Sequence, residues 1–170
     1  MSRKNYNVVL SSQFCTNDTI VNVNTNKNYY IDWSAVLPDK NFKLSFSFIS
    51  EGNIITELAD IPIITIDFLN QGKIVATQSS PTTYQATSSN VLGLIFPTYL
   101  DPNAHKAYFR ADKNFNQPVY LSRPKLNNFN VRIINNSNIP VLWLDDGIPL
   151  TTPAVTINNY VLILSFEECD

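Results

Sequence analysis

Side chains that could carry out catalysis are few in this chain, and they do not form a known catalytic pattern. His105 is the only histidine among 170 residues, and it lies in the turn-like segment 101–106. Nucleophilic catalysis would pair this histidine with an activated serine or cysteine. The chain has neither a GxSxG elbow nor a cysteine signature of that kind. We therefore interpret His105 as a surface loop residue and predict that the protein has no catalytic residue.

The most visible pair of carboxylates is Asp145 and Asp146, which Gly147 follows directly. Paired carboxylates can hydrolyse glycosides, but neighbouring residues of a strand point to opposite faces. The glycine instead predicts a turn that closes the preceding strand. A calcium loop would show the DxDxDG spacing, which is missing here. The two glutamates at 167–168 are interpreted as a solvated end, so we expect no metal.

Cys15 and Cys169 are the only cysteines, which is too few for a zinc site. The segment 1–7 lacks the apolar stretch of a signal peptide. We therefore expect folding in a reducing compartment and interpret both cysteines as buried free thiols. The four glycines stand apart from one another, so the chain has no phosphate loop or dinucleotide fingerprint. We expect no cofactor.

The composition excludes several classes of protein. Hydrophobic residues make up 44% of the chain, charged residues make up 15%, and the formal net charge is -2. A disordered chain would be less hydrophobic and more charged. A nucleic-acid-binding protein would gather its basic residues, whereas here only Arg3 and Lys4 are adjacent. No apolar run approaches the roughly 20 residues of a membrane span, so we expect neither nucleic acid nor membrane as a partner.

Alternation of apolar and polar residues, the period of a half-buried strand, is clearest at 42–48. The intervening lysine and serines of this segment are expected to face away from the core. The four side chains expected to form one wall of the core are Phe42, Leu44, Phe46 and Phe48.

Other short apolar runs are bounded by turn residues, and windows with helical periodicity are nearly absent. We therefore predict one all-β domain over residues 1–170, with helix confined to one or two short turns. Its architecture is predicted to be a β-sandwich of two antiparallel sheets with about eight core strands plus short edge strands. The other runs lie at 7–10, 19–23, 29–33, 61–68, 73–77, 91–96, 107–111, 119–121, 129–133, 139–144 and 160–166.

Two of the predicted strands, within 139–144 and 160–164, are apolar on both faces. Each strand of a two-sheet sandwich has one solvated face, so such strands need a second cover. The segment 79–90, rich in serine and threonine, is expected to be a loop and a poor cover. We therefore predict that a neighbouring subunit covers part of this surface. The residues expected in the assembly surface are Val141, Leu142, Leu144, Val161 and Ile163.

Several stretches, taken in order, resemble one family of viral proteins. They are YYIDW at 29–33, LP at 37–38, FKLSFSFIS at 42–50, QPVYL at 117–121, RP at 123–124, NNFNV at 127–131, WLDD at 143–146 and YVLILSFE at 160–167. Together they resemble the short single-jelly-roll capsid proteins, of penton or minor capsid type, of nucleocytoplasmic large DNA viruses and their virophage and polinton-like relatives.

This resemblance implies a single jelly roll that serves as a structural virion protein. Major capsid proteins of these viruses have two jelly rolls, and this chain has room for one, so the implied role is a vertex penton or a minor, cementing component. The implied partners are copies of itself, as a pentamer or trimer, and other capsid proteins. The implied location is the virion, after synthesis in the host cytoplasm. Such proteins have no active site, so the resemblance transfers no functional residue.

Two other functions remain open. The first is a carbohydrate- or receptor-binding β-sandwich, for which a trimer is one form, in which exposed tyrosines would contact a sugar. An ordinary place in strands is the alternative for these aromatic residues. The second is a cupin-like enzyme, which is disfavoured because cupin metal sites use several histidines. The tyrosines considered for sugar contact are Tyr84, Tyr99, Tyr108 and Tyr120.

Overall fold

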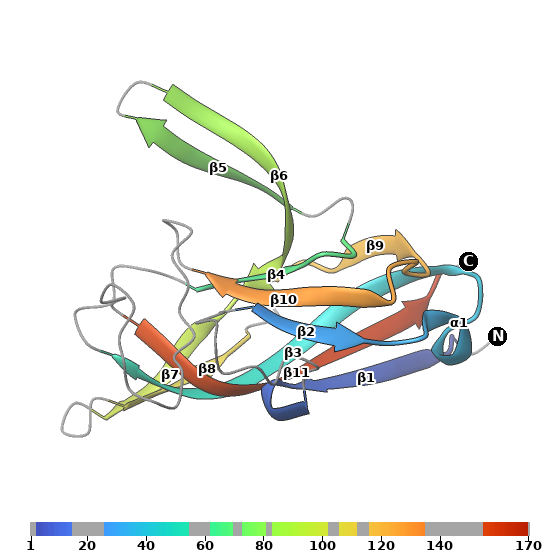
Figure 1. The fold of residues 1–170 in the computed structure, drawn as a ribbon, viewed down its shortest axis with the longest axis horizontal. Helices are drawn as coiled ribbons and strands as arrows, with labels where there is room; N and C mark the ends of the chain where they lie inside the picture. Colours follow the sequence, from blue (N-terminus) through green and yellow to red (C-terminus); the bar gives the residue numbers. More distant parts are fainter. Residues whose placement is uncertain are drawn as a thin grey trace.

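The computed structural model describes residues 3–14, 26–54, 62–69, 73–80, 83–101, 106–111, 116–134 and 155–169. Within these residues the helical content is one α-helical turn and one 3-10 turn, as predicted (Figure 1). The elements in chain order are β1 (Asn5–Ser11), η1 (Ser12–Phe14), β2 (Asn26–Tyr30), α1 (Trp33–Val36), β3 (Asn41–Ile54), β4 (Ile63–Ile66), β5 (Lys73–Ser80), β6 (Thr83–Leu94), β7 (Phe96–Asp101), β8 (Lys106–Arg110), β9 (Val119–Ser122), β10 (Asn128–Ile134) and β11 (Val155–Glu168).

The strands form two antiparallel sheets that face each other, which confirms the predicted all-β sandwich (Figure 1). The six-stranded sheet has the order β1-β11-β3-β8-β7, and β9 pairs with the opposite half of β3. The five-stranded sheet has the order β2-β10-β4-β6-β5. Strands β1 and β2 are therefore edge strands, each at one end of its sheet.

The connectivity is that of a jelly roll. The pairs β1–β11, β2–β10, β3–β8 and β4–β6 are nested in the sequence, so that the first strand pairs with the last and each inner pair lies within the previous one. Successive pairs alternate between the two sheets, which places β1-β11-β3-β8 opposite β2-β10-β4-β6. This arrangement of Greek keys in two sheets defines the jelly roll. The predicted fold class is confirmed.

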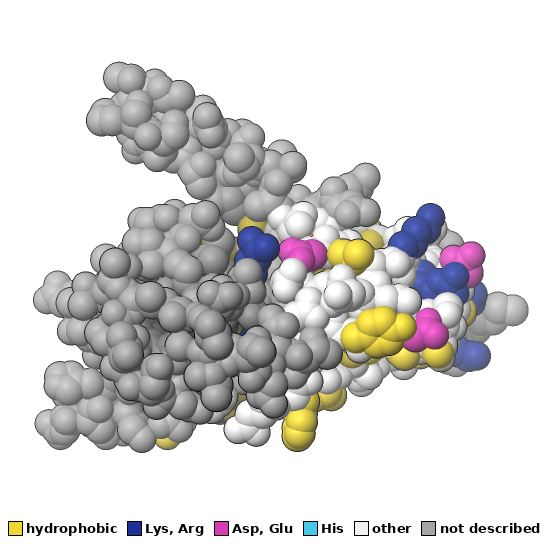
Figure 2. Space-filling view, in the orientation of Figure 1, with side chains coloured by type: hydrophobic (Ala, Val, Ile, Leu, Met, Phe, Trp, Pro, Cys, Tyr) yellow, Lys and Arg dark blue, Asp and Glu magenta, His cyan; other side chains and the backbone are white. Residues whose placement is uncertain are grey.

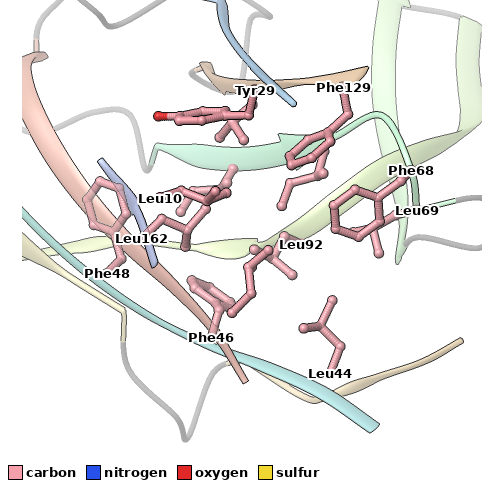
Figure 3. Close-up of a cluster of buried hydrophobic side chains, with 14 of the residues drawn as sticks. Leu10, Tyr29, Leu44, Phe46, Phe48, Phe68, Leu69, Leu92, Phe129 and Leu162 are labelled. Carbon is pink, nitrogen blue, oxygen red and sulfur yellow. The ribbon is translucent and has the colours of Figure 1, made fainter. Parts of the chain in front are cut away.

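Side chains from both sheets meet in one hydrophobic core (Figure 3). The predicted wall on β3 is confirmed, since its lysine and serines at 43, 45 and 47 face outward and its large apolar side chains are at most 7% exposed. Strand β11 contributes a second wall that alternates in the same way. The buried members of these two walls are Phe42, Leu44, Phe46, Phe48, Tyr160, Leu162, Leu164 and Phe166.

Trp33 closes one end of the core. The run at 29–33 was predicted to be one strand, but β2 ends at Tyr30, and Asp32 caps a helical turn that begins at Trp33. The Asp32 carboxylate accepts hydrogen bonds from the hydroxyl and the backbone N–H of Ser34, which favours a helix start over a continued strand. The indole contacts rings from both sheets, and its Nε1 donates to the Leu126 carbonyl at 3.0 Å.

The segment 79–90 was predicted to be a loop, and this prediction is wrong. The described part of its backbone, 79–80 and 83–90, belongs to β5 and β6, which pair antiparallel and extend from the sandwich (Figure 1). Threonine has a high strand propensity, and a ribbon that projects into solvent needs no apolar face. Apolar periodicity therefore could not identify it. The strands predicted at 19–23 and 139–144 lie outside the described residues.

Candidate functional site

Four aliphatic side chains form a patch on the outward face of the six-stranded sheet. The outer apolar patch, as we call it, consists of Val9, Ile49, Val161 and Ile163. Val9 is 61% exposed and Ile49 is 50% exposed, whereas Val161 and Ile163 are half-buried between their neighbouring strands. Aliphatic side chains with this exposure are ordinary when they occur singly. Their contiguity on one face is the feature that calls for an explanation.

Strand register brings the four residues together from three separate parts of the chain. Val9 of β1 is the direct partner of Ile163 on β11. Val161, two residues earlier on β11, is the direct partner of Ile49 on β3. Direct partners in an antiparallel pair have Cβ atoms about 4.5–5.5 Å apart. All four side chains point away from the core because their chain neighbours, such as Leu10 and Leu162, point into it.

Uncharged polar side chains border the patch toward the chain termini. The Ser165 hydroxyl donates to Asn7 Oδ1 at 2.8 Å, and Ser45 and Ser47 are exposed beside it. In this direction charged groups begin farther along, where Glu167 lies 3.3 Å from Arg3 and 3.5 Å from Lys43. On the other side of the patch, the exposed Arg110 of β8 is the direct partner of Ile49. Figure 2 shows several basic and acidic side chains at the end of the sandwich where both termini lie, and a further basic and acidic group nearer the middle of the molecule.

Two of the five residues predicted for the assembly surface, Val161 and Ile163, lie in this patch. The other three, Val141, Leu142 and Leu144, lie outside the described residues. Val9 and Ile49 were not predicted. Their signal was present in the sequence, because Ile49 continues the outward parity of the segment 42–48 and Val9 is apolar next to the apolar Val8.

A separate cluster of polar side chains around Glu168 joins the ends of three strands. Its carboxylate accepts a hydrogen bond from Lys40 Nζ at 2.6 Å and another from the Tyr6 hydroxyl at 2.8 Å. The bond from Lys40, followed by that from Tyr6, lowers the pKa of the Glu168 carboxyl. The same bond raises the pKa of the Tyr6 hydroxyl, because the proton is held against a carboxylate. This arrangement ties strand ends together and offers no group poised for catalysis.

A cleft of about 670 Å³ lies beside β9 and the segment that follows it. Buried walls come from Phe42, Phe68 and Leu69, and the polar groups at its mouth include Tyr120 and Arg123. The volume lies in the range of small-molecule sites, roughly 300–1,000 Å³. Arg123 is already engaged, since its guanidinium donates to the Leu37 carbonyl at 3.3 Å and lies 3.6 Å from Asp39.

The residues considered for catalysis and metal binding add little to this site. His105, Asp145, Asp146 and Cys15 lie outside the described residues. Cys169 is a free thiol that lines the cleft, half-buried rather than buried as predicted, because it follows the end of β11 at the mouth of the cleft. Among the residues that the structure describes, no group of three or more His, Cys, Asp and Glu is placed to hold a metal ion. None of the described helices is long and apolar enough to cross a membrane.

Of the tyrosines considered for sugar contact, the two whose side chains the structure describes, Tyr108 and Tyr120, lie far apart. Tyr120 is 66% exposed and pairs with Lys43, and Tyr108 is 42% exposed and pairs with Glu51. These two positions on β3 are separated by eight residues, which is roughly 26 Å along a strand. The side chains of Tyr84 and Tyr99 lie outside the described part of the structure.

Comparison with known proteins returns no relative. The chain matches no family model, no curated protein and no solved structure.

Proposed function

We propose that this protein is a structural virion component, a vertex penton or a minor, cementing capsid protein, which acts by assembling with copies of itself and with other capsid proteins. The outer apolar patch is the observation that carries this proposal. Its four side chains form one aliphatic surface across β1, β11 and β3, in which Val9 and Ile49 are the most exposed. Burial of a surface of this kind against another subunit removes it from water and stabilises the assembly.

The fold supports the same function. Jelly rolls occur in viral capsids, in lectins and in cupins, so the topology alone does not choose among them. The sequence resemblance described above favours the capsid proteins. A cupin site would need several metal ligands, and the described residues hold no such cluster. An outward aliphatic patch is useful to a subunit that packs side by side with others.

The test is a single charge in the patch. The Ile163→Asp variant should fail to form the oligomer that the wild type forms, because an unpaired carboxylate in a desolvated interface costs several kcal/mol. The matched control is Asn128→Asp, which introduces the same charge on the exposed face of the opposite sheet. Native mass spectrometry should show a pentamer or trimer for the wild type and the control, and the loss of that assembly for Ile163→Asp with an unchanged circular dichroism spectrum. A wild-type protein that stays monomeric at high concentration and fails to join a shell would contradict the proposal.

The cleft beside β9 favours a second candidate, a carbohydrate- or receptor-binding module. Exposed Tyr120 lines the cleft together with Asn41 and Lys125, so an aromatic ring and amide and ammonium donors share one cleft that a small ligand could enter. In this case Tyr120→Ala should abolish retention on a glycan array, and the Ile163→Asp variant should bind the array as the wild type does. Absence of any glycan bound by the wild type would leave the assembly function alone.

A further inference from the structure

Strand β1 presents an open edge of the six-stranded sheet. It pairs with β11 on one side, and no strand in the described part of the chain pairs with its other side. The pairing with β11 runs over all seven residues without a shift in register. An edge of this kind carries a row of main-chain donors and acceptors that another strand can use.

The direction of each main-chain group on β1 follows from one hydrogen bond. The Glu168 N–H donates to the Lys4 carbonyl at 3.0 Å, so the main chain of Lys4 faces β11. In an antiparallel strand this direction alternates residue by residue. The groups of Tyr6, Val8 and Leu10 therefore also face β11. The residues whose N–H and C=O groups point to the open edge are Asn5, Asn7, Val9 and Ser11.

An independent contact beyond the end of β1 agrees with this alternation. Position 12 continues the register of the strand and lies opposite Tyr160. The Tyr160 N–H points toward β1 at this position and donates to Ser12 Oγ at 3.0 Å. The Ser12 hydroxyl thus takes the place of the main-chain carbonyl where the strand turns into η1.

Natural edge strands are protected by charged residues, proline, bulges or short length, and β1 has none of these. β7 contains Pro97 and a register shift beside it, and β9 has four residues. β5 has two register shifts, and the five-residue β2 contains Lys27. β1 is seven residues long, regular, and free of proline and charge. Of the described edge strands it is the one best prepared to pair with another chain.

The geometry points to a second copy of this chain as the occupant, with the two β1 strands pairing antiparallel across a two-fold axis at Val8. This inference rests on the proposed assembly function and names one of its contacts. Centring on Val8 places Asn5 opposite the partner's Ser11 and Asn7 opposite the partner's Val9. In each β1 strand, the four residues whose main-chain groups point to the open edge are then all paired with the partner. No main-chain donor at this edge of β1 stays unpaired.

The charges of the segment also fit this register. Arg3 falls opposite the partner's Gln13, and Lys4 falls opposite the partner's Ser12, so no like charges face each other across the pair. The inward-facing Tyr6 lies opposite the partner's Leu10, and Leu10 lies opposite the partner's Tyr6, so each gains an apolar cross-strand neighbour. Since the contact is isologous, it closes as a dimer and differs from the cyclic contact that would build a pentamer or trimer.

The experiment uses two substitutions at one residue. Asn7→Pro removes an N–H that points to the open edge and leaves the bonds to β11 in place, as proline does at solvent-facing edge positions. Asn7→Ala is the matched control, because both variants lose the 2.8 Å bond with Ser165 and only proline loses the N–H. The dimer dissociation constant should rise at least about ten-fold in Asn7→Pro, since two symmetry-related hydrogen bonds are lost. It should stay near that of the wild type in Asn7→Ala.

Amide hydrogen exchange of the wild type gives a readout that does not depend on the variant folding. The amides of Asn7 and Val9 should exchange more slowly as protein concentration rises, whereas those of Val8 and Leu10 should be protected at every concentration. Equal, concentration-independent exchange at Asn7 and Val9 would overturn the inference. The proposed function is tested separately by Ile163→Asp: if that variant still forms the pentamer or trimer, the role of the patch falls, whereas a variant that loses this assembly and keeps a dimer with a protected Asn7 amide supports both contacts.

Discussion

The ring of Phe46 on β3 packs directly against the backbone of Gly93 on β6, in the opposite sheet. A Cβ atom added at Gly93 would lie 2.5 Å from a ring carbon of Phe46 and would also meet the side-chain oxygen of Asn116. The absence of a side chain at residue 93 is therefore what lets the two sheets approach at this point. Figure 3 shows the Phe46 ring directed into the space between the sheets.

Gly93→Ala should consequently destabilise the fold. Overpacking of a well-packed core costs about 1–3 kcal/mol, to be measured as the free energy of unfolding in urea. Adding Phe46→Leu should relieve the part of the clash that involves the ring, although the contact with Asn116 stays, so the double variant should be more stable than the sum of the two single changes predicts. Strict additivity would show that the two residues do not touch.

Truncation of the core wall should cost far more than truncation of the outer face of the same strand. Phe46→Ala removes a ring that is 7% exposed and should lower the free energy of unfolding by about 3–5 kcal/mol. Ser45→Ala changes an exposed neighbour and should alter it by less than about 0.5 kcal/mol. Similar losses at the two positions would refute the register of β3.

Asn116 acts as a substitute for a strand at the end of β6. Its Oδ1 accepts from the Leu94 N–H at 2.7 Å, and its Nδ2 donates to the Leu94 carbonyl at 2.8 Å. Asn116→Asp keeps the acceptor but sets a second carboxylate oxygen against that carbonyl, at a cost of about 1–3 kcal/mol near neutral pH. Protonation restores a donor, so the deficit should shrink as pH falls through the raised pKa of the new carboxyl. A deficit that is the same at pH 3 and pH 7 would exclude this explanation.

Stability should depend on pH at both ends of the scale through Glu168 and Tyr6. The pKa of Glu168 is lowered in the folded state from its usual 4.5, so its contribution is present above 4.5 and is lost as pH falls through the lower folded pKa. The pKa of Tyr6 is raised above 10.0, so its contribution is present below 10.0 and is lost as pH rises through the higher folded pKa. Thermal melts across this range should therefore show a loss at each end.

The variant that tests this dependence is Glu168→Gln, which should flatten both the acid and the alkaline loss. Glu167→Gln is the matched control, because Glu167 makes exposed ion pairs of the kind that contribute little to stability. Equal flattening by the two substitutions would show that the pH dependence does not come from the Glu168 cluster.

Local sequence determined which face of each strand is buried. The period of two in 42–48 predicted the inward residues of β3, and the apolar character of both faces of 160–164 placed Val161 and Ile163 in the predicted assembly surface. Side-chain parity depends only on backbone geometry along a single strand. The same reasoning failed at 79–90, since this segment, rich in serine and threonine, has no apolar periodicity in its sequence.

Pairing between strands was decided by the tertiary structure alone. Val9 and Ile163 are at opposite ends of the chain and become direct neighbours because β1 and β11 form the outermost of the nested pairs. The contact of Phe46 with Gly93 likewise depends on the distance between sheets, and the open edge of β1 depends on which strands lie beside it. Each of these relationships involves residues that are far apart in sequence. Main-chain hydrogen bonds are alike for every residue, so they do not select a partner strand. The packing of the whole core makes that selection.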